Sequence, residues 1–352
     1  GLGDVYKRQI QNIADHLGLS RNTVSKALKN SSEVSENTRN LVIKTASKLG
    51  YKNATFATPV IPASETGSNG TILFLTRTYA SDSEFWTTVL RGIESILSNA
   101  NYHLAISIMS DSDLKQLNFP QTISDSSIKG IILVEICDKV VCDALSQFNL
   151  PIVSVDMPNV PFEELNGIDV VTMESKKNLK KIINQLIEKG AESFGFVGDL
   201  YSPNVSRGFQ ERYNALSECL AEHQLPLNQK NCLLHQTPED FRNFQTTVNN
   251  LQAMISLPDV FICGNDWTAI QLIYALQFLG FQIPKDICVV GFDNIPAASR
   301  ISPSLTTIST PQKYLGIAAA RQILERIQHP NCPHVFCQYE TELIIRNSTN
   351  IT

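Results

Sequence analysis

Residues 10–51 read IQNIADHLGLSRNTVSKALKNSSEVSENTRNLVIKTASKLGY and decide how the chain begins to fold. Apolar residues recur at helical spacing on both sides of Gly18, which indicates two short amphipathic helices that meet at a tight turn. Ala14 is small where two helices must cross closely, and Gly18 tolerates the positive φ of the turn. Ser20 suits the N-cap of the second helix. The stretch therefore predicts a helix-turn-helix.

The second predicted helix has a polar face whose chemistry suits DNA. Its Arg, Lys and Asn donors match phosphate oxygens and the acceptor edges of guanine and adenine. A third helix should begin at an N-cap of Ser35 and end at Gly50. The alternative is an ordinary three-helix surface module in which the same side chains form a solvated face. The residues predicted to contact DNA in this segment are Ser20, Arg21, Asn22, Thr23, Ser25, Lys26, Lys29 and Thr38.

Short motifs in this stretch carry a resemblance to a known family. They are Ile13-Ala14, Gly18-Leu19-Ser20, Thr23-Val24-Ser25-Lys26, Val34-Ser35, Thr38-Arg39 and Leu49-Gly50-Tyr51. Together they resemble the headpiece of the lactose/galactose repressor (LacI/GalR) family of bacterial transcription regulators. Two positions depart from the family pattern: Lys26 stands where Arg is usual, and Lys29-Asn30 stands where Asn-Gly is usual. These departures concern the operator sequence that is read, not the fold.

The charge distribution agrees with a DNA-binding end. The chain has 352 residues and a net charge of -5, yet residues 1–58 carry +5, so the remainder carries -10. A basic head on an acidic body confines phosphate attraction to one end. The length suggests two or three domains. No apolar run approaches 18 residues and no secretory leader is evident, so we expect a cytoplasmic protein.

A linker is expected after the headpiece. Residues 53–69 are rich in Ala, Thr, Ser, Pro and Gly, which is typical of a linker. The family resemblance implies a hinge here that folds as a short helix on DNA and places an apolar residue in the minor groove. Val60 is the candidate for that contact, although the neighbouring Pro59 restricts a helix at this point.

From residue 70 onward, strand-like apolar runs alternate with helical stretches, which predicts parallel sheets covered by helices and more than one sheet. The family resemblance resumes here and implies a core similar to periplasmic sugar-binding proteins, with two subdomains joined by three crossovers around a ligand. It rests on Phe196-Val197-Gly198-Asp199, Glu211-Arg212-Tyr213, Asn265-Asp266, Ile283-Pro284, Val289-Val290-Gly291-Phe292-Asp293-Asn294 and Leu305-Thr306-Thr307-Ile308. Expected strands are 72–75, 104–108, 130–134, 152–155, 170–171, 194–197, 260–263 and 287–292; expected helices are 85–98, 177–189, 206–222 and 267–279.

The predicted fold class is therefore an all-α helix-turn-helix headpiece followed by an α/β core of two doubly wound parallel-sheet subdomains, like the periplasmic binding proteins. We expect the headpiece at 10–52, the linker at 53–69 and the core at 70–347. One subdomain is expected at about 70–168 and 305–332, and the other at about 169–304 and 333–347.

Polar residues at the ends of predicted strands are the candidate ligand contacts, because ligands of open α/β sheets bind beyond the carboxyl ends of the strands. A carboxylate can accept hydrogen bonds from two sugar hydroxyls, an Arg can donate to several oxygens, and an aromatic ring can stack on an apolar sugar face. Capping is an equal alternative for Asp266, and core packing is an alternative for Phe85. The predicted ligand-binding residues are Phe85, Trp86, Asp156, Arg212, Asn265 and Asp293, with Trp267 a weaker candidate.

Metal binding and catalysis are weighed against this hypothesis. Most of the eight cysteines lie in apolar contexts and are expected to be small buried hydrophobes. His329, Cys332, His334 and Cys337 are closely spaced, but the segment is typical of a Pro-containing loop entering a strand, so no metal is predicted. No cofactor is predicted either. The pair Asp266 and Asp293 could serve a glycosidase, but no P-loop, GxSxG or GxGxxG motif is present, and we expect no enzyme.

The resulting hypothesis is a ligand-responsive transcription regulator, a repressor by family resemblance, that binds operator DNA as a homodimer and senses a sugar or sugar derivative. Further pairing of dimers is left open. The alternatives are a sugar-binding protein of the periplasmic type and a glycoside-acting enzyme.

Overall fold

The computed structural model describes residues 11, 13–28, 34, 35, 38, 41, 42, 45, 68–77, 83–200, 206–235 and 243–349. The chain divides into two compact units, residues 1–67 and 68–352, which are treated separately below. The predictions made for Lys29 and Val60 lie outside the described residues.

The first unit contains the predicted helix-turn-helix. Residues 13–17 are helical, Gly18 has a φ of +63°, and helix α2 spans Arg21–Leu28. The Ser20 hydroxyl accepts a hydrogen bond from the Thr23 amide at 3.0 Å, which is the predicted N-cap. A small core holds the helices together and consists of Ile13, Ala14, Val24, Ala27, Val34 and Val42.

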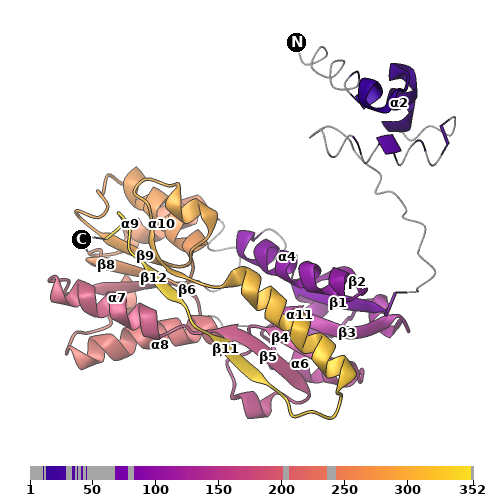
Figure 1. The fold of residues 1–352 in the computed structure, drawn as a ribbon. Helices are drawn as coiled ribbons and strands as arrows, with labels where there is room; N and C mark the ends of the chain where they lie inside the picture. The colour runs from indigo at the N-terminus through magenta and orange to yellow at the C-terminus, as the bar shows by residue number, and fades with distance from the viewer. Residues whose placement is uncertain are drawn as a thin grey trace. The chain divides into compact units, whose positions relative to one another are not determined.

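The second unit begins with an all-parallel sheet (Figure 1). Among the described residues it has six strands: β1 (Thr71–Arg77), β2 (His103–Met109), β3 (Ile128–Val134), β4 (Ile152–Val155), β5 (Ile168–Met173) and β11 (Phe336–Tyr339). Their order across the sheet is β11-β5-β4-β3-β1-β2. The helices that pack on this sheet are α4 (Glu84–Asn99), α5 (Asp111–Gln116), α6 (Lys139–Ser146) and α11 (Gln312–Gln328), with short turns η2 (Gln121–Ser124) and η3 (Phe162–Glu164).

A second sheet repeats the same arrangement. In the described part of the chain its six strands are β6 (Phe194–Asp199), β7 (Leu233–His235), β8 (Val260–Cys263), β9 (Cys288–Asp293), β10 (Thr306–Ser309) and β12 (Glu342–Ile344), in the order β12-β10-β9-β8-β6-β7. Only β12 is antiparallel to its neighbour among these strands. Figure 1 shows one helix pair on each side of this sheet: α7 (Lys177–Glu188) with α8 (Arg207–Glu222), and α9 (Phe244–Ala253) with α10 (Asp266–Phe278). The short turns η4 (Gln229–Asn231) and η5 (Pro296–Ser299) complete it. The predicted α/β fold class is confirmed.

The boundaries predicted between the two subdomains are wrong for three strands. Strand β5 pairs with β4, and β11 pairs with β5, so both belong to the first sheet although they were expected in the second subdomain. Strand β10 pairs with β9 and belongs to the second sheet, although 305–332 was expected in the first subdomain. The physical reason is that each strand joins the sheet that offers its backbone a hydrogen-bonding partner. The chain therefore crosses between the sheets at residues 174–176, 310–311 and 340–341.

Two glycines let α4 and α11 lie side by side on the first sheet (Figure 1). A Cβ atom on Gly316 would overlap the carbonyl oxygen of Val89, and one on Gly92 would overlap that of Lys313. The two helix backbones therefore approach as closely as glycine permits.

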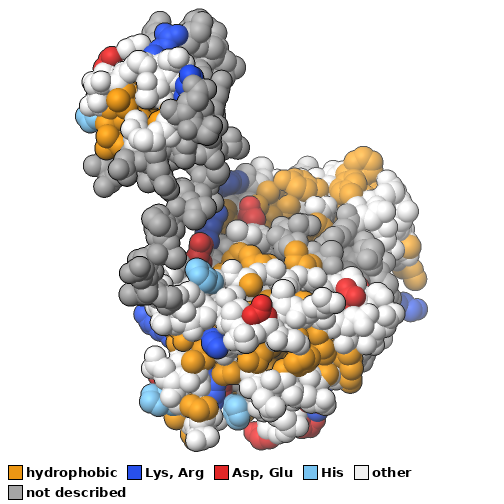
Figure 2. All heavy atoms as spheres, turned by 90° about the vertical axis from the view of Figure 1, so that its right-hand side faces the viewer, with side chains coloured by type: hydrophobic (Ala, Val, Ile, Leu, Met, Phe, Trp, Pro, Cys, Tyr) orange, Lys and Arg blue, Asp and Glu red, His pale blue; other side chains and the backbone are white. Residues whose placement is uncertain are grey.

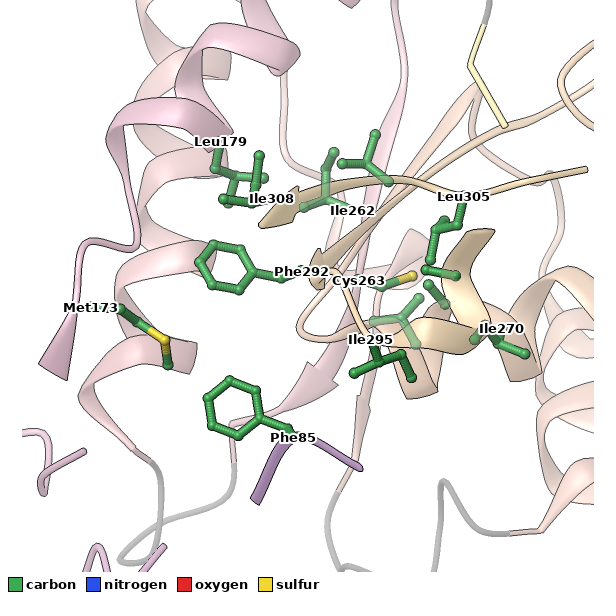
Figure 3. Close-up of a cluster of buried hydrophobic side chains, with 14 of the residues drawn as sticks. Phe85, Met173, Leu179, Ile262, Cys263, Ile270, Phe292, Ile295, Leu305 and Ile308 are labelled. Atoms are coloured by element: carbon green, nitrogen blue, oxygen red, sulfur yellow. The ribbon is translucent and has the colours of Figure 1, made fainter. Parts of the chain in front are cut away.

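A single hydrophobic cluster includes side chains from both subdomains. Figure 3 shows Phe85 of α4, Met173 at the end of β5 and Phe292 of β9 pointing toward one another. The two sheets are thus joined by packed apolar side chains as well as by the three crossovers.

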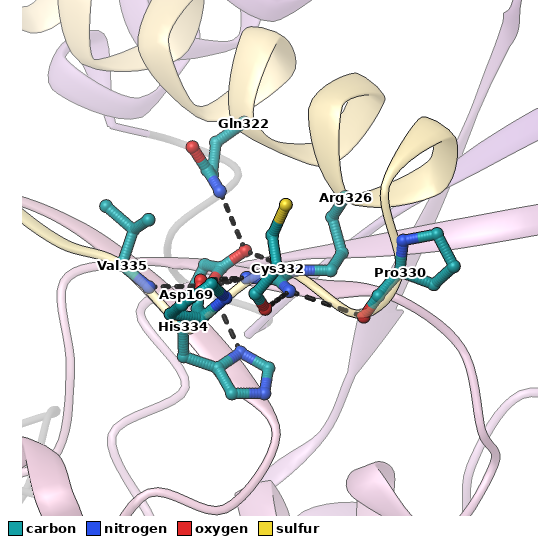
Figure 4. A network of polar contacts seen from close by, with 8 residues as sticks. Asp169, Gln322, Arg326, Pro330, Cys332, His334 and Val335 are labelled. Atoms are coloured by element: carbon teal, nitrogen blue, oxygen red, sulfur yellow. Dashed lines mark hydrogen bonds and ion pairs between the residues drawn. The ribbon is translucent and has the colours of Figure 1, made fainter.

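A buried ion pair anchors the return of the chain to the first sheet (Figure 4). Asp169 of β5 is 0% exposed, and its carboxylate accepts hydrogen bonds from Arg326 Nε and Nη2 at 3.0 and 2.8 Å. Gln322 Nε2 and the amide of Val335 also donate to it, at 2.9 Å each. The other end of the Arg326 guanidinium donates to carbonyl oxygens of the loop that precedes β11, namely those of Pro330, Cys332 and Pro333.

Candidate functional site

The candidate DNA-contacting surface lies on α2. Val24 and Ala27 face the small core of the headpiece, whereas Arg21 and Asn22 are exposed. Figure 2 shows Lys and Arg side chains on the described surface of this unit. An amphipathic helix with exposed Arg and Asn is what major-groove recognition requires.

The other residues predicted to contact DNA occupy less exposed positions. Ser25, Lys26 and Thr23 are partly buried, and the Thr23 hydroxyl lies 2.8 Å from that of Ser20. Thr38 is also partly buried, and its amide donates to the Ser35 hydroxyl at 3.3 Å. Ser20, Thr23 and Thr38 therefore take part in helix capping, which orients α2 and the third helix.

The candidate ligand site lies where the strand order of each sheet reverses. The reversal falls between β1 and β3 in the first sheet and between β6 and β8 in the second. Ligands of open α/β sheets bind at such points, beyond the carboxyl ends of the strands. Ionisable side chains at or just after the carboxyl ends of strands, together with Arg212 of α8, form a group that we call the inter-sheet cluster, which consists of Arg77, Glu135, Asp156, Asp199, Arg212 and Asp293.

Both sheets contribute to this cluster. The charge of Glu135, which follows β3, interacts with Asp156 of the first subdomain and with Asp199 at the end of β6. The charge of Asp293, at the end of β9, interacts with Arg212 of its own subdomain and with Glu135 of the other. The predicted residues Asp156, Arg212 and Asp293 are therefore brought together.

Arg212 lies at the centre of the cluster and is 3% exposed. Its Nη1 donates to the carbonyl oxygen of Gly264 at 2.7 Å, and its guanidinium carbon lies 3.6 Å from the ring centroid of Phe292. Its Nε is buried and has no hydrogen-bond partner among the described residues. Burial lowers the pKa of Arg212, while Asp293 and Asp156 act in the opposite direction. A buried donor without a partner carries a desolvation cost that a ligand oxygen would remove.

The two predicted carboxylates have constrained backbones and shifted pKa values. Asp293 has a φ of 113° and Asp156 a φ of 75°, both in the left-handed region that non-glycine residues rarely adopt. Burial raises the pKa of Asp293 well above its ordinary value, and Arg212 opposes that rise. Burial also raises the pKa of Asp156 to about 6, although the Met157 amide donates to its carboxylate at 2.8 Å.

Glu135 is a cluster residue that the sequence reasoning missed. It follows β3 directly and has a φ of 56°. Burial raises the pKa of Glu135 to about 8, whereas Arg77 and a hydrogen bond from Trp86 lower it. Its Oε2 is buried and has no hydrogen-bond partner among the described residues. The signal was the one used for Asp156: a polar residue directly after an apolar strand.

The remaining predicted ligand contacts take other positions. Trp86 reaches the cluster through its hydrogen bond to Glu135. Phe85 is buried in the hydrophobic cluster of Figure 3, with its ring centroid 4.5 Å from that of Trp86. Asn265 caps α10, since its side chain accepts from the Thr268 amide at 2.9 Å. Trp267, the weaker candidate, is 39% exposed on α10.

Asp266 has a structural position. It is fully buried, and its two carboxylate oxygens accept from the Ile295 amide at 2.9 Å and the Thr307 hydroxyl at 2.5 Å. Burial raises the pKa of Asp266 to about 7. These bonds tie α10 to the segment after β9 and to β10.

Two of the four closely spaced His and Cys residues near the end of the chain, His334 and Cys332, take part in the ion-pair network of Figure 4. Nδ1 of His334 lies 3.1 Å from Asp169, and the Cys332 carbonyl accepts from Arg326. Within the described ranges, no group of three or more His, Cys, Asp or Glu side chains is arranged to hold a metal ion. Nor does any helix in those ranges combine the length and the apolar character needed to cross a membrane.

Comparisons with known proteins agree with this architecture. Residues 9–53 match the family model described as bacterial regulatory proteins, lacI family, and residues 183–349 match the periplasmic binding protein-like domain. The transcriptional repressor PurR of Photobacterium profundum is 26% identical over 344 residues, covering 96% of this chain and 98% of the relative.

Two solved structures share the fold. A LacI family regulator from Enterococcus faecium with bound ribose is 24% identical with a TM-score of 0.65, covering 79% of this chain and 98% of that chain. The lac repressor dimer bound to operator and the anti-inducer ONPF is 20% identical with a TM-score of 0.66, covering 96% and 97%. From its headpiece, its two-sheet core and these matches, the chain belongs to the lacI family of bacterial regulatory proteins.

Proposed function

We propose that this protein is a transcriptional repressor that binds operator DNA as a homodimer, and that a sugar or sugar derivative bound at the inter-sheet cluster sets its operator affinity. The observation that carries the ligand part is the buried Nε of Arg212, which lacks a partner among the described residues while the guanidinium stacks on Phe292. A hydroxylated ligand offers oxygens to this donor and hydroxyl protons to the surrounding carboxylates. The ribose in the Enterococcus faecium regulator supports the same ligand chemistry.

Exposed apolar side chains on the second subdomain support a homodimer. Phe244 of α9 and Phe278 of α10 have ring centroids 5.9 Å apart, and Phe278 is 69% exposed. Tyr274 on the same helix and Ile255 just after α9 are also exposed, the latter to 94%. Figure 2 shows further hydrophobic side chains on the surface of the core. Grouped exposed apolar residues mark interaction surfaces, and a two-fold dimer would present two headpieces to two half-sites.

The geometry does not favour the glycoside-acting alternative. A glycosidase needs two carboxyl groups on opposite sides of a bond, but both oxygens of Asp266 are engaged within its own subdomain. We therefore propose a non-enzymatic regulator that acts in the cytoplasm, where its DNA is found.

The test compares operator binding with and without ligand in the wild type and in Arg212→Met. A thermal-shift screen of sugars, sugar phosphates and nucleobases first identifies a stabilising compound, because a ligand that binds the folded state raises its apparent stability. Arg212→Met should remove the effect of that compound on operator affinity and keep ligand-free operator binding. The matched control is Arg300→Met, an exposed position that should keep the response.

Two results would contradict the proposal. The first is a full ligand response in Arg212→Met. The second is equal wild-type affinity for operator and scrambled duplex, which would remove the DNA-binding assignment itself.

A further inference from the structure

A buried hydroxyl group that lacks a partner lies in the crossover between β5 and α7. Ser175 is 1% exposed, and its Oγ has no hydrogen-bond partner among the described residues. It comes two residues after the carboxyl end of β5 and before the first residue of α7, so no helical carbonyl of a preceding turn can accept from it. Ligands of open α/β sheets bind beyond such strand ends.

Ser175 lies near Arg212, beside the same glycine of α8. A Cβ atom on Gly208 would lie 3.4 Å from Ser175 Oγ and 3.3 Å from Arg212 Nη2. The first turn of α8 therefore has both polar groups against its bare backbone. Arg212 Nε is the other buried atom here that has no partner in the described part of the chain. Two unsatisfied polar groups, one from each side of Gly208, thus lie close together.

The crossover holds the Ser175 hydroxyl in its buried position. Glu174 Oε1 accepts hydrogen bonds from the amides of Lys176 and Lys177 at 2.7 and 2.8 Å. The Glu174 amide donates to the carbonyl oxygen of Tyr339 at 2.8 Å. Because the residues on both sides of Ser175 are bonded, its side chain cannot turn to solvent without breaking backbone hydrogen bonds. The desolvation cost of the hydroxyl therefore stays until a ligand supplies a partner.

We infer that Ser175 is a further ligand contact, whose hydroxyl forms a hydrogen bond with the same sugar hydroxyl that accepts from Arg212 Nε. The inference rests on the proposed ligand site and adds a residue of the first crossover to it. A sugar hydroxyl has one donor and two acceptor positions, so it can bond both groups at once. The ligand then touches a segment that joins the two subdomains.

The experiment uses the full chain, with D-ribose, D-glucose, D-galactose and D-mannose as probes in isothermal titration calorimetry. The wild type should bind at least one of these sugars. Ser175→Ala should bind that sugar roughly tenfold more weakly, because the sugar hydroxyl loses a buried partner. Without sugar, the urea midpoint of Ser175→Ala should be unchanged or higher, since the variant removes a buried hydroxyl that has no partner in the described protein.

Ser348→Ala is the matched control, because it removes a buried hydroxyl that does have partners. Ser348 is 0% exposed, and its Oγ donates to the Val289 carbonyl at 2.6 Å and accepts from the Thr306 amide at 2.8 Å. These partners stand at the beginning of β9 and β10, at the opposite end of the strands from Asp293. Ser348→Ala should therefore lower the urea midpoint and keep the sugar affinity.

Monodeoxy analogues of the bound sugar identify the hydroxyl that Ser175 contacts. Each analogue is titrated into the wild type and into Ser175→Ala. For one analogue the two losses of affinity should not add, because the missing sugar hydroxyl and the missing serine hydroxyl belong to the same hydrogen bond. Losses that add for every analogue would overturn the inference.

The remaining outcomes separate this inference from the proposed function. If Arg212→Met abolishes sugar binding and Ser175→Ala keeps the wild-type affinity, the ligand site stands and Ser175 is excluded from it. If the urea midpoint of Ser175→Ala falls as far as that of Ser348→Ala, the hydroxyl has a structural role and the inference is wrong. If the wild type binds none of the four sugars, the inference fails together with the proposed sugar ligand.

Discussion

Replacing Asp169 by Asn should destabilise the core more than any surface change, because it removes the charge from a buried pair. Asp169 is 0% exposed and Arg326 is 5% exposed, so the guanidinium would keep its charge without a countercharge (Figure 4). Removing one partner of a buried ion pair costs about 3–5 kcal/mol. Arg326 would retain its bonds to the carbonyl oxygens of Pro330 and Pro333. We therefore expect Asp169→Asn to lower the free energy of unfolding by about 3 kcal/mol, at the lower end of that range.

The assay is urea unfolding followed by circular dichroism at a fixed protein concentration. The midpoint should fall with an unchanged slope, which identifies a loss of stability rather than a change in the denatured state. Lys177→Gln is the control, since it breaks an ion pair to Glu340 whose side chains are 66% and 71% exposed, and it should have little effect. A loss below about 1 kcal/mol in Asp169→Asn would refute the reasoning, because that is the value of an exposed pair.

Four further substitutions test other parts of the molecule. Asn22→Ala should lower affinity for the operator by about 1–3 kcal/mol while scrambled DNA is unaffected, whereas Lys29→Ala should weaken both; equal discrimination by wild type and Asn22→Ala in fluorescence anisotropy would contradict this. Gly316→Ala should destabilise the core by about 1–3 kcal/mol, because its Cβ would overlap the opposite helix, and an unchanged urea midpoint would contradict it. Burial raises the pKa of Asp266 to about 7 from its ordinary value of 3.8, so the folded state holds the proton more tightly and stability falls as pH rises from about 4 to 7. Asp266→Asn should flatten that fall, which is at most ~1.4 kcal/mol per pH unit, and parallel wild-type and variant curves would speak against it.

Elements that depend on local sequence could be predicted closely. The strand expected at 152–155 is β4 with the same bounds, and the helix expected at 177–189 is α7 at Lys177–Glu188. Both have a regular apolar period and polar or Pro residues beside them. Helix α11 was not among the predicted elements. Gly316 and the Ala residues of α11 give no clear apolar periodicity in the sequence. Their small size is explained only by the close packing of α11 against α4, which is a contact between segments far apart in the chain.

The membership of strands in sheets was not predictable for the same reason. In the sequence, strand β10 follows β9 of the second sheet and precedes α11, which packs on the first sheet. Its own residues are compatible with either sheet. The choice depends on its pairing with β9, about fifteen residues earlier in the chain. Asp156, Arg212 and Asp293 were predicted because each follows a strand or lies in a family motif. Glu135 also follows a predicted strand, so the sequence carried a signal for it, but its place in the cluster became clear only from the position of β3 beside the switch point.

Asp293 links the candidate ligand site to the movement that a regulator needs. Its carboxyl group belongs to the inter-sheet cluster, while its carbonyl oxygen accepts from the Thr310 hydroxyl at 3.1 Å and from Gln312 Nε2 at 2.7 Å. Residues 310–311 form the crossover from β10 to α11, so the same residue contacts the ligand region and holds a connection between the subdomains. The other two crossovers are tied together, because the Glu174 amide donates to the Tyr339 carbonyl at 2.8 Å. A ligand that binds Asp293 more tightly in one arrangement of the subdomains would therefore stabilise one geometry of the 310–311 crossover, and such unequal affinity for two arrangements is what allosteric control requires.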